Sequence, residues 1–145
     1  MTIKENFAFA VEKHKKNNFK IAEKFYKKIL KKDPNHFNSI FLLGTLSFQT
    51  AKFGLAKQLF QKATQIQPNN MEAHYNLGNT LKELGEFQKA KNCYARAIQI
   101  NANYLNAYNN LGTVFEELKD YQKAINCYQK SLELQPNHIQ TFYNL

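Results

Sequence analysis

The chain of 145 residues has little of what marks a membrane, secreted or disulfide-bonded protein. No apolar run approaches the ~20 residues of a membrane span, and charges interrupt the first sixteen positions, where a secretion signal would need an apolar core. The two cysteines, Cys93 and Cys127, occupy equivalent places in neighbouring repeats, roughly 10 Å apart, which is too far for a disulfide. We therefore expect a reducing, cytoplasmic location.

Residues that would build a catalytic or nucleic-acid site are also scarce. The four histidines are scattered, and neither they nor the cysteines show a metal-ligand spacing. Only five glycines are present, and none forms a phosphate-binding loop. The single arginine, Arg96, argues against nucleic acid as a partner, because such sites usually add arginines and aromatic platforms. The sequence predicts a chain without enzymatic activity, cofactor or metal.

What the chain does contain is a repeat of 34 residues. Residues of one type recur at this interval and define columns. The columns are Pro34, Pro68 and Pro136 (with Ala102 between them), Gly44, Gly78 and Gly112, Ala22, Ala56, Ala90 and Ala124, and the aromatic column Tyr26, Phe60, Tyr94 and Tyr128. A fixed period of this size indicates one small structural module stacked several times.

Each repeat is predicted to be a pair of helices. Apolar residues recur at steps of three and four from Met71 to Leu81 and again from Phe87 to Ile98, with a break at Gly85. Such steps place them on one helical face. We expect a single array over 1–145, with repeats 3–36, 37–70, 71–104 and 105–138 and a partial helix 139–145. That unfinished helix suggests a longer protein, or an end that docks on another copy.

Each column is expected to have its own structural role. The glycines let the second helix approach the first, opposite the alanine column, and the aromatic column fills the space between repeats. The prolines end the second helices, and the asparagine after each caps the next helix. At Ala102 the proline is missing, so we expect a less abrupt turn and a longer second helix.

The spacing Ile40-x2-Leu43-Gly44, repeated from His74 and Tyr108 and followed by Ala-x3-aromatic and proline, resembles the tetratricopeptide repeat (TPR). The resemblance implies an all-α, right-handed superhelical solenoid of antiparallel helix pairs, here four repeats and a partial fifth. The first repeat is degenerate, with Ala10 at the glycine position, as a terminal cap often is. Ser47 and the absence of tryptophan also depart from the family pattern.

In this family the first helices line a concave groove. The asparagine column Asn76, Asn110 and Asn144 resembles the asparagine ladder in the TPR arrays of O-linked N-acetylglucosamine transferase and bacterial TPR-containing transferases. The resemblance implies a non-catalytic scaffold that binds an extended protein segment. The other expected groove residues are Tyr75, Asn79, Asn109, Thr113 and, in the apolar second repeat, Phe41. The alternative is that these asparagines are solvated residues or local caps.

Three other readings concern partners. The chain can be the substrate-selecting or oligomerising N-terminal arm of a larger bacterial glycosyltransferase or sulfotransferase. It can also self-associate through its C-terminal end. Residues 1–36 hold ten lysines against four acidic residues, which is +6 of the net charge of +9. Six of these lysines form a stripe that fits an acidic protein, a nucleic acid or an anionic membrane surface, but we expect a plain solvated helix face. The lysines of this stripe are Lys20, Lys24, Lys27, Lys28, Lys31 and Lys32.

Overall fold

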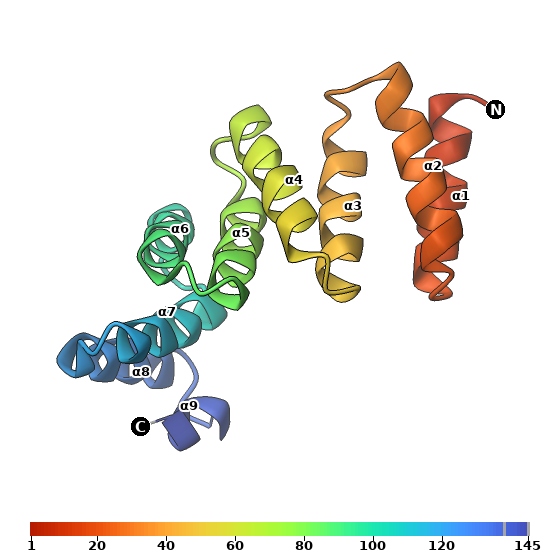
Figure 1. Cartoon of the computed structure of the whole chain (residues 1–145). Coiled ribbons are helices and arrows are strands. Elements are labelled where there is room, and N and C mark those ends of the chain that lie inside the picture. Colours follow the sequence, from red (N-terminus) through yellow and green to blue (C-terminus); the bar gives the residue numbers. More distant parts are fainter. Residues whose placement is uncertain (138, 145) are drawn as a thin grey trace. The chain divides into compact units, whose positions relative to one another are not determined.

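The computed structural model describes residues 1–137 and 139–144, and all regular structure in this part of the chain is helical. The helices are α1 (Ile3–Lys15), α2 (Phe19–Lys32), α3 (Phe37–Gln49), α4 (Phe53–Ile66), α5 (Met71–Glu83), α6 (Phe87–Ile100), α7 (Leu105–Glu117), α8 (Tyr121–Leu134) and α9 (Ile139–Asn144) (Figure 1). They form two compact units, Met1–Pro68 and Asn69–Leu145, called here the first and second unit. His138 and Leu145, which fall in the predicted turn and partial helix, lie outside the described residues.

The 34-residue period is visible in the helix boundaries. The helices α1, α3, α5 and α7 each have 13 residues, and α2, α4, α6 and α8 each have 14. Within each unit, consecutive helices pack on one another, and in the second unit α5 also contacts α7. In the second unit, the first helices of two neighbouring repeats are therefore in contact.

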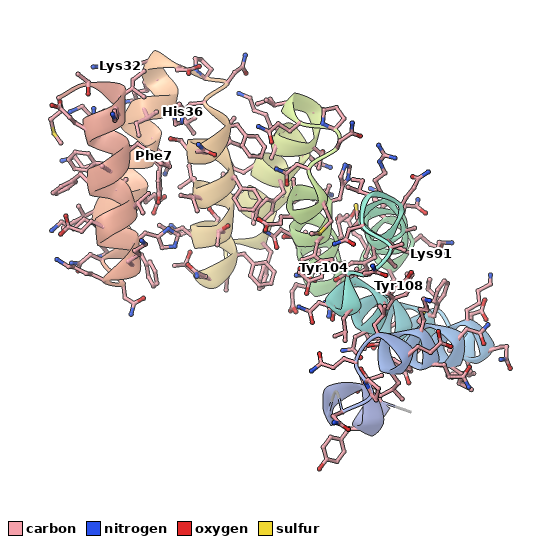
Figure 2. All side chains as sticks on the ribbon, turned by 180° about the vertical axis from the view of Figure 1, so that it is seen from behind. Phe7, Lys32, His36, Lys91, Tyr104 and Tyr108 are labelled. Atoms are coloured by element: carbon pink, nitrogen blue, oxygen red, sulfur yellow. The ribbon has the colours of Figure 1, made fainter. Side chains whose placement is uncertain are left out.

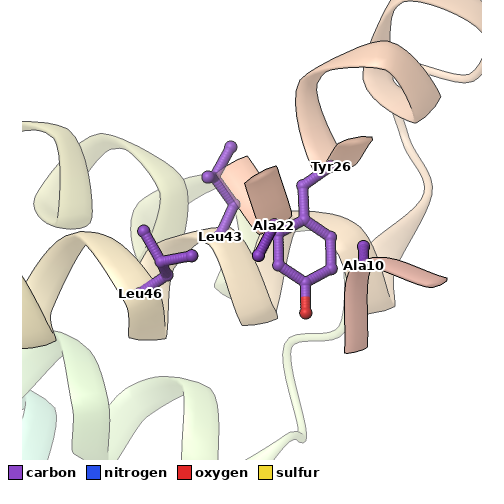
Figure 3. Packing of buried hydrophobic residues seen from close by; sticks show 5 residues of the cluster. All are labelled: Ala10, Ala22, Tyr26, Leu43 and Leu46. Carbon is purple, nitrogen blue, oxygen red and sulfur yellow. The ribbon is translucent and has the colours of Figure 1, made fainter. Parts of the chain in front are cut away.

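The core of the first unit is built around Tyr26. Its ring lies among Ala10 of α1, Ala22 of its own helix α2, and Leu43 and Leu46 of α3 (Figure 3). Tyr26 is fully buried. The expected place of the aromatic column between successive helix pairs is therefore confirmed for Tyr26. Removing such a ring costs about 3–5 kcal/mol.

The glycine column has a more specific role than expected. A Cβ atom built on Gly44 would lie 2.9 Å from the ring of Phe60, and one built on Gly78 would lie 2.8 Å from the ring of Tyr94. Real Cβ atoms do not approach other atoms so closely. Each glycine therefore makes room for the aromatic ring of the second helix in its own repeat, rather than for the alanine column.

The expectation for Ala102 is wrong. Helix α6 has 14 residues, like α2, and ends at the same place in the repeat. An Asx turn forms here with or without the proline: the Asn103 amide donates to Asn101 Oδ1 at 3.1 Å across Ala102, and the Asn35 amide donates to Asp33 Oδ1 across Pro34. The Tyr108 hydroxyl also donates to the Ala102 carbonyl at 3.0 Å (both tyrosines of this turn, Tyr104 and Tyr108, are labelled in Figure 2).

The prediction for the helix caps is wrong by one residue. The N-caps of α3 and α5 are His36 and Asn70, not the asparagines that follow the prolines. His36 Nδ1 accepts from the Ser39 amide, and the His36 ring meets the Phe7 ring edge-on, with the ring centroids 5.4 Å apart (Figure 2). Asn70 Oδ1 accepts from the Ala73 amide at 3.0 Å. The cap lies one residue later because this is the last residue with an extended backbone.

The turn inside each repeat contains a left-handed residue. These residues recur every 34 positions and have φ angles of 60°, 58°, 73° and 62° at Asn17, Ala51, Gly85 and Lys119. Only glycine adopts this conformation without a steric cost. The turn geometry is thus maintained at Ala51 and Lys119, whose side chains oppose it, and at Asn17, a residue type that tolerates it.

Candidate peptide-binding site

The predicted site residues lie on first helices, with Phe41 in the first unit and the rest in the second. Tyr75, Asn76 and Asn79 lie on α5, Asn109, Asn110 and Thr113 on α7, and Asn144 on α9. The contact between α5 and α7 brings two groups of these residues together.

Asn110 is the centre of a hydrogen-bond network between α5 and α7. Its Nδ2 donates to the Tyr75 hydroxyl at 2.8 Å and to Asn79 Oδ1 at 3.2 Å. Its Oδ1 accepts from Lys82 Nζ at 3.3 Å. The buried Tyr94 hydroxyl donates to the same Asn79 oxygen at 2.6 Å. Both hydrogens of the Asn110 amide are therefore already used inside the protein.

A second network surrounds Asn109. Its Oδ1 accepts from Asn144 Nδ2 at 3.2 Å and from Thr141 Oγ1 at 3.2 Å. Asn109 is buried, and its amide oxygen connects α7 to α9. This placement differs from an open groove position, because these contacts hold the last helix in place.

In both networks an asparagine is bonded to a residue at the same distance along the sequence. Asn110 donates to Tyr75 and Asn144 donates to Asn109, so both asparagines donate to the residue 35 positions earlier. Among the residues described, the partly buried Asn76 side chain has no hydrogen-bond partner. The three asparagines of the column are therefore in different states.

The remaining predicted residues contribute in other ways. Thr113 Oγ1 donates to the Asn110 carbonyl at 2.8 Å and so turns toward its own helix. The Phe41 ring stacks on Phe37 with centroids 5.9 Å apart and meets Phe60 edge-on at 5.8 Å. In the structure Phe41 is a packing residue, and its role as an apolar anchor stays a prediction.

Two charged side chains accompany the amides. Lys82 of α5 is partly buried, and this burial lowers its pKa, an effect that the negative charge of Glu83 partly offsets. Glu116 takes the equivalent place on α7, where its Oε2 accepts from the Tyr128 hydroxyl at 2.9 Å. Burial first, and then this bond to Glu116, raise the pKa of Tyr128.

The described residues contain no group of three or more His, Cys, Asp or Glu side chains placed to hold a metal ion. Both cysteines are free thiols, and burial raises the pKa of Cys93 and of Cys127 to about 11. His14, which sequence analysis left unassigned, contacts the Tyr26 hydroxyl at 3.2 Å and Gln49 Oε1 at 2.7 Å. Within the described part of the chain, no helix has the length and apolar character to cross a membrane.

The lysine stripe lies on the surface of α2 in the first unit. Glu23 pairs with Lys27 at 2.6 Å and with Lys52 at 3.0 Å. Lys28 lies over the Phe25 ring, with its ammonium 5.5 Å from the ring centroid. An open hollow of about 490 Å³ runs along this face, lined by Lys20, Glu23, Lys24, Lys27, Lys28 and Lys31. One carboxylate among five lysines leaves the face strongly basic.

Comparison with known proteins identifies the fold family. A tetratricopeptide-repeat model matches residues 69–137, and a model of anaphase-promoting complex (cyclosome) subunit 3 matches residues 15–97. No curated protein sequence matches the chain.

Similar solved structures agree with this result. A crystal structure of MamA is 30% identical, with a TM-score of 0.90 over 93% of this chain and 79% of that one. A second MamA structure is 29% identical, with a TM-score of 0.94 over 98% and 78%. MamA from Desulfovibrio magneticus RS-1 shares 18% identity and a TM-score of 0.90 over 95% and 78%, which shows a common fold. The all-α fold class is confirmed, whereas the likeness to transferase arrays stays a prediction. The chain belongs to the tetratricopeptide-repeat family.

Proposed function

We propose that the chain is a non-catalytic protein-binding scaffold that takes an extended segment of its partner on the amide face. The amide face consists of Tyr75, Asn76 and Asn79 on α5 with Asn110 and Thr113 on α7. Membership of the tetratricopeptide-repeat family supports protein binding in general. The polar, partly buried side chains of this face support the more specific part of the proposal.

The observation that carries the proposal is the Asn76 amide, which has no partner among the described residues. A primary amide offers two donors and one acceptor oxygen. It can therefore bind the N–H and C=O groups of an extended peptide without reading its side chains. A partly buried amide without partners gains more from such bonds than a fully solvated one does.

Asn110 is expected to contribute less. Its Nδ2 already donates to Tyr75 and Asn79, so a bound peptide must replace existing bonds rather than add new ones. An exchange of one hydrogen bond for another changes the binding free energy little. Asn110 is thus expected to hold α5 and α7 in register, with Asn76 making the gain on binding.

The proposal is tested with a random library of 12-residue peptides selected on the intact chain. For the selected peptides, calorimetry should show that Asn76→Ala weakens binding about threefold to tenfold, the equivalent of one net hydrogen bond. Thermal stability should be unchanged, because this side chain has no internal bond among the described residues. Asn92→Ala, on the exposed surface of α6, is the matched control and should leave binding unchanged.

Two results would contradict the proposal. One is unchanged affinity in Asn76→Ala with an intact fold. The other is an equal loss in Asn76→Ala and Asn92→Ala, which would indicate a general surface effect rather than a site on α5.

A further inference from the structure

Lys82 is the only lysine of α5, and its surroundings differ from those of the ion-paired lysines of the second unit. Lys89, Lys123 and Lys130 are more exposed and pair with Glu86, Asp120 and Glu133 at 3.0, 3.2 and 3.5 Å. Lys82 is partly buried beside the amide face, and its one partner among the described residues is Asn110 Oδ1 at 3.3 Å.

An ammonium group has three hydrogens to donate. The bond to Asn110 is long for a charged donor, and it uses only one of the three. Lys82 forms no ion pair among the described residues, and the charge of the neighbouring Glu83 offsets its loss of solvation only in part. A carboxylate arriving at Lys82 would supply the missing charge and accept the unused hydrogens.

The next repeat presents the opposite charge in the same place. Glu116 lies 34 residues after Lys82, at the equivalent position of α7. Its Oε2 accepts from the Tyr128 hydroxyl, and the side chain is exposed. The bond to the buried Tyr128 orients this carboxylate, and a carboxylate still has acceptor sites for an arriving cation.

We propose that the amide face selects extended segments that place an acidic side chain at Lys82 and a basic side chain at Glu116. This inference rests on the proposed function and specifies its partner. Equivalent positions of neighbouring repeats are about 10 Å apart, and an extended chain advances about 3.3 Å per residue. The two charged residues of the partner are therefore about three positions apart.

An extended peptide fits these observations better than a nucleic acid does. A phosphate backbone carries a negative charge at every nucleotide and would therefore meet the carboxylate of Glu116 one repeat beyond the cation. A zwitterionic sequence of acid, spacer and base matches both charges. Alternating charge also excludes wrong partners by repulsion.

The test compares peptides selected from the same 12-residue library on the wild-type chain and on charge variants. Wild-type selection should enrich Asp or Glu at one position and Lys or Arg about three positions away. Lys82→Glu should replace the acidic preference with a basic one. Glu116→Gln, which keeps an oxygen acceptor for Tyr128, should lose the basic preference and keep the acidic one.

A direct measurement accompanies the selection. In a selected peptide, changing the acidic residue to its amide should weaken binding to the wild-type chain about tenfold. The same change should not alter the affinity of the peptide for the Lys82→Gln variant. Lys123→Glu, a change at an ion-paired lysine on α8, is the control and should leave the selected sequences unchanged.

The outcomes separate this inference from the proposed function. Selected peptides that depend on Asn76 but show no charge preference, or a preference that Lys82→Glu leaves unchanged, would overturn the inference alone. Failure to select any peptide, or peptides insensitive to Asn76→Ala, would overturn the proposed function and this inference with it. Circular dichroism of each variant shows whether the fold is retained.

Discussion

A single added methyl group at Gly112 should destabilise the second unit. Gly112 lies in the middle of α7, and a Cβ atom built there would come within 2.8 Å of Cδ1 and Cζ of Tyr128. The Tyr128 ring cannot easily move away, because it is buried and its hydroxyl is bonded to Glu116. We therefore predict that Gly112→Ala shifts either the ring or the spacing of α7 and α8.

The magnitude follows from two opposing effects. Overpacking of a tight core costs about 1–3 kcal/mol, and an overlap of this depth belongs in the upper part of that range. Alanine in place of glycine gains up to about 1 kcal/mol of helix propensity. The net loss should be about 1–2 kcal/mol. At Gly54, the second residue of α4, a Cβ atom would meet nothing within 4 Å, so Gly54→Ala should stabilise, by up to about 0.5 kcal/mol because this position is in the first turn of the helix.

Urea denaturation followed by circular dichroism at 222 nm measures both variants. Because repeat arrays can unfold in parts, the comparison should use the midpoint and the slope of the transition together. In the double variant Gly112→Ala/Tyr128→Leu the loss of stability should be smaller than the sum of the losses in the two single variants, since the overlap disappears with the ring. A stabilising effect of Gly112→Ala, similar to that of Gly54→Ala, would refute the steric argument.

Three further predictions concern the turns and the buried tyrosines. Ala102→Pro should stabilise by about 0.5–1 kcal/mol, because Asn101 has φ −134° and ψ 98°, close to the −133° and 91° of Asp33 before Pro34; a lower urea midpoint would contradict this. Lys119→Gly should also stabilise, by about 0.5–1 kcal/mol in the same assay, because it removes the strain of a left-handed lysine at φ 62°. As a control, glycine in place of an exposed lysine with helical φ should not stabilise the chain. Burial raises the pKa of Tyr26 to about 12 and raises the pKa of Tyr94 and Tyr128 too, so the folded chain keeps these hydroxyls protonated where the unfolded chain ionises. The contribution of these tyrosines to stability should therefore be complete below about pH 10 and should be lost as the pH rises toward 12, with the absorbance at 295 nm showing delayed ionisation. Full titration of all tyrosines near pH 10 without unfolding would disprove it.

Most of the fold could be predicted from the sequence because its signals are local and repeated. The spacing of apolar residues from Met71 to Leu81 indicated a helix, and α5 spans that range. The predictions for the turns were wrong where more than one kind of residue can satisfy the hydrogen-bonding groups of the backbone. The turn at Ala102 forms without proline, because Asn101 and Tyr108 supply hydrogen bonds that composition does not reveal. The left-handed column was missed since only Gly85 in it is a glycine.

The site could be predicted only in part. The column containing Asn76 and Asn110 was visible as a regularity, and both residues are on first helices, as expected. Their different states were not visible, because a hydrogen bond depends on the neighbour across the repeat. Tyr75 offers Asn110 an acceptor, whereas the Asn76 side chain has no hydrogen-bond partner among the described residues. Lys82 went unnoticed because nothing in its sequence neighbourhood shows that it is partly buried.

The sequence by itself thus determined the period, the helices and the family, because helical periodicity and the close contact of glycine with an aromatic ring are requirements of each repeat separately. Only the tertiary structure decided which polar groups are already paired. That outcome depends on distances between side chains of different helices, such as the 2.8 Å from Asn110 to Tyr75, and these arise when the repeats pack together.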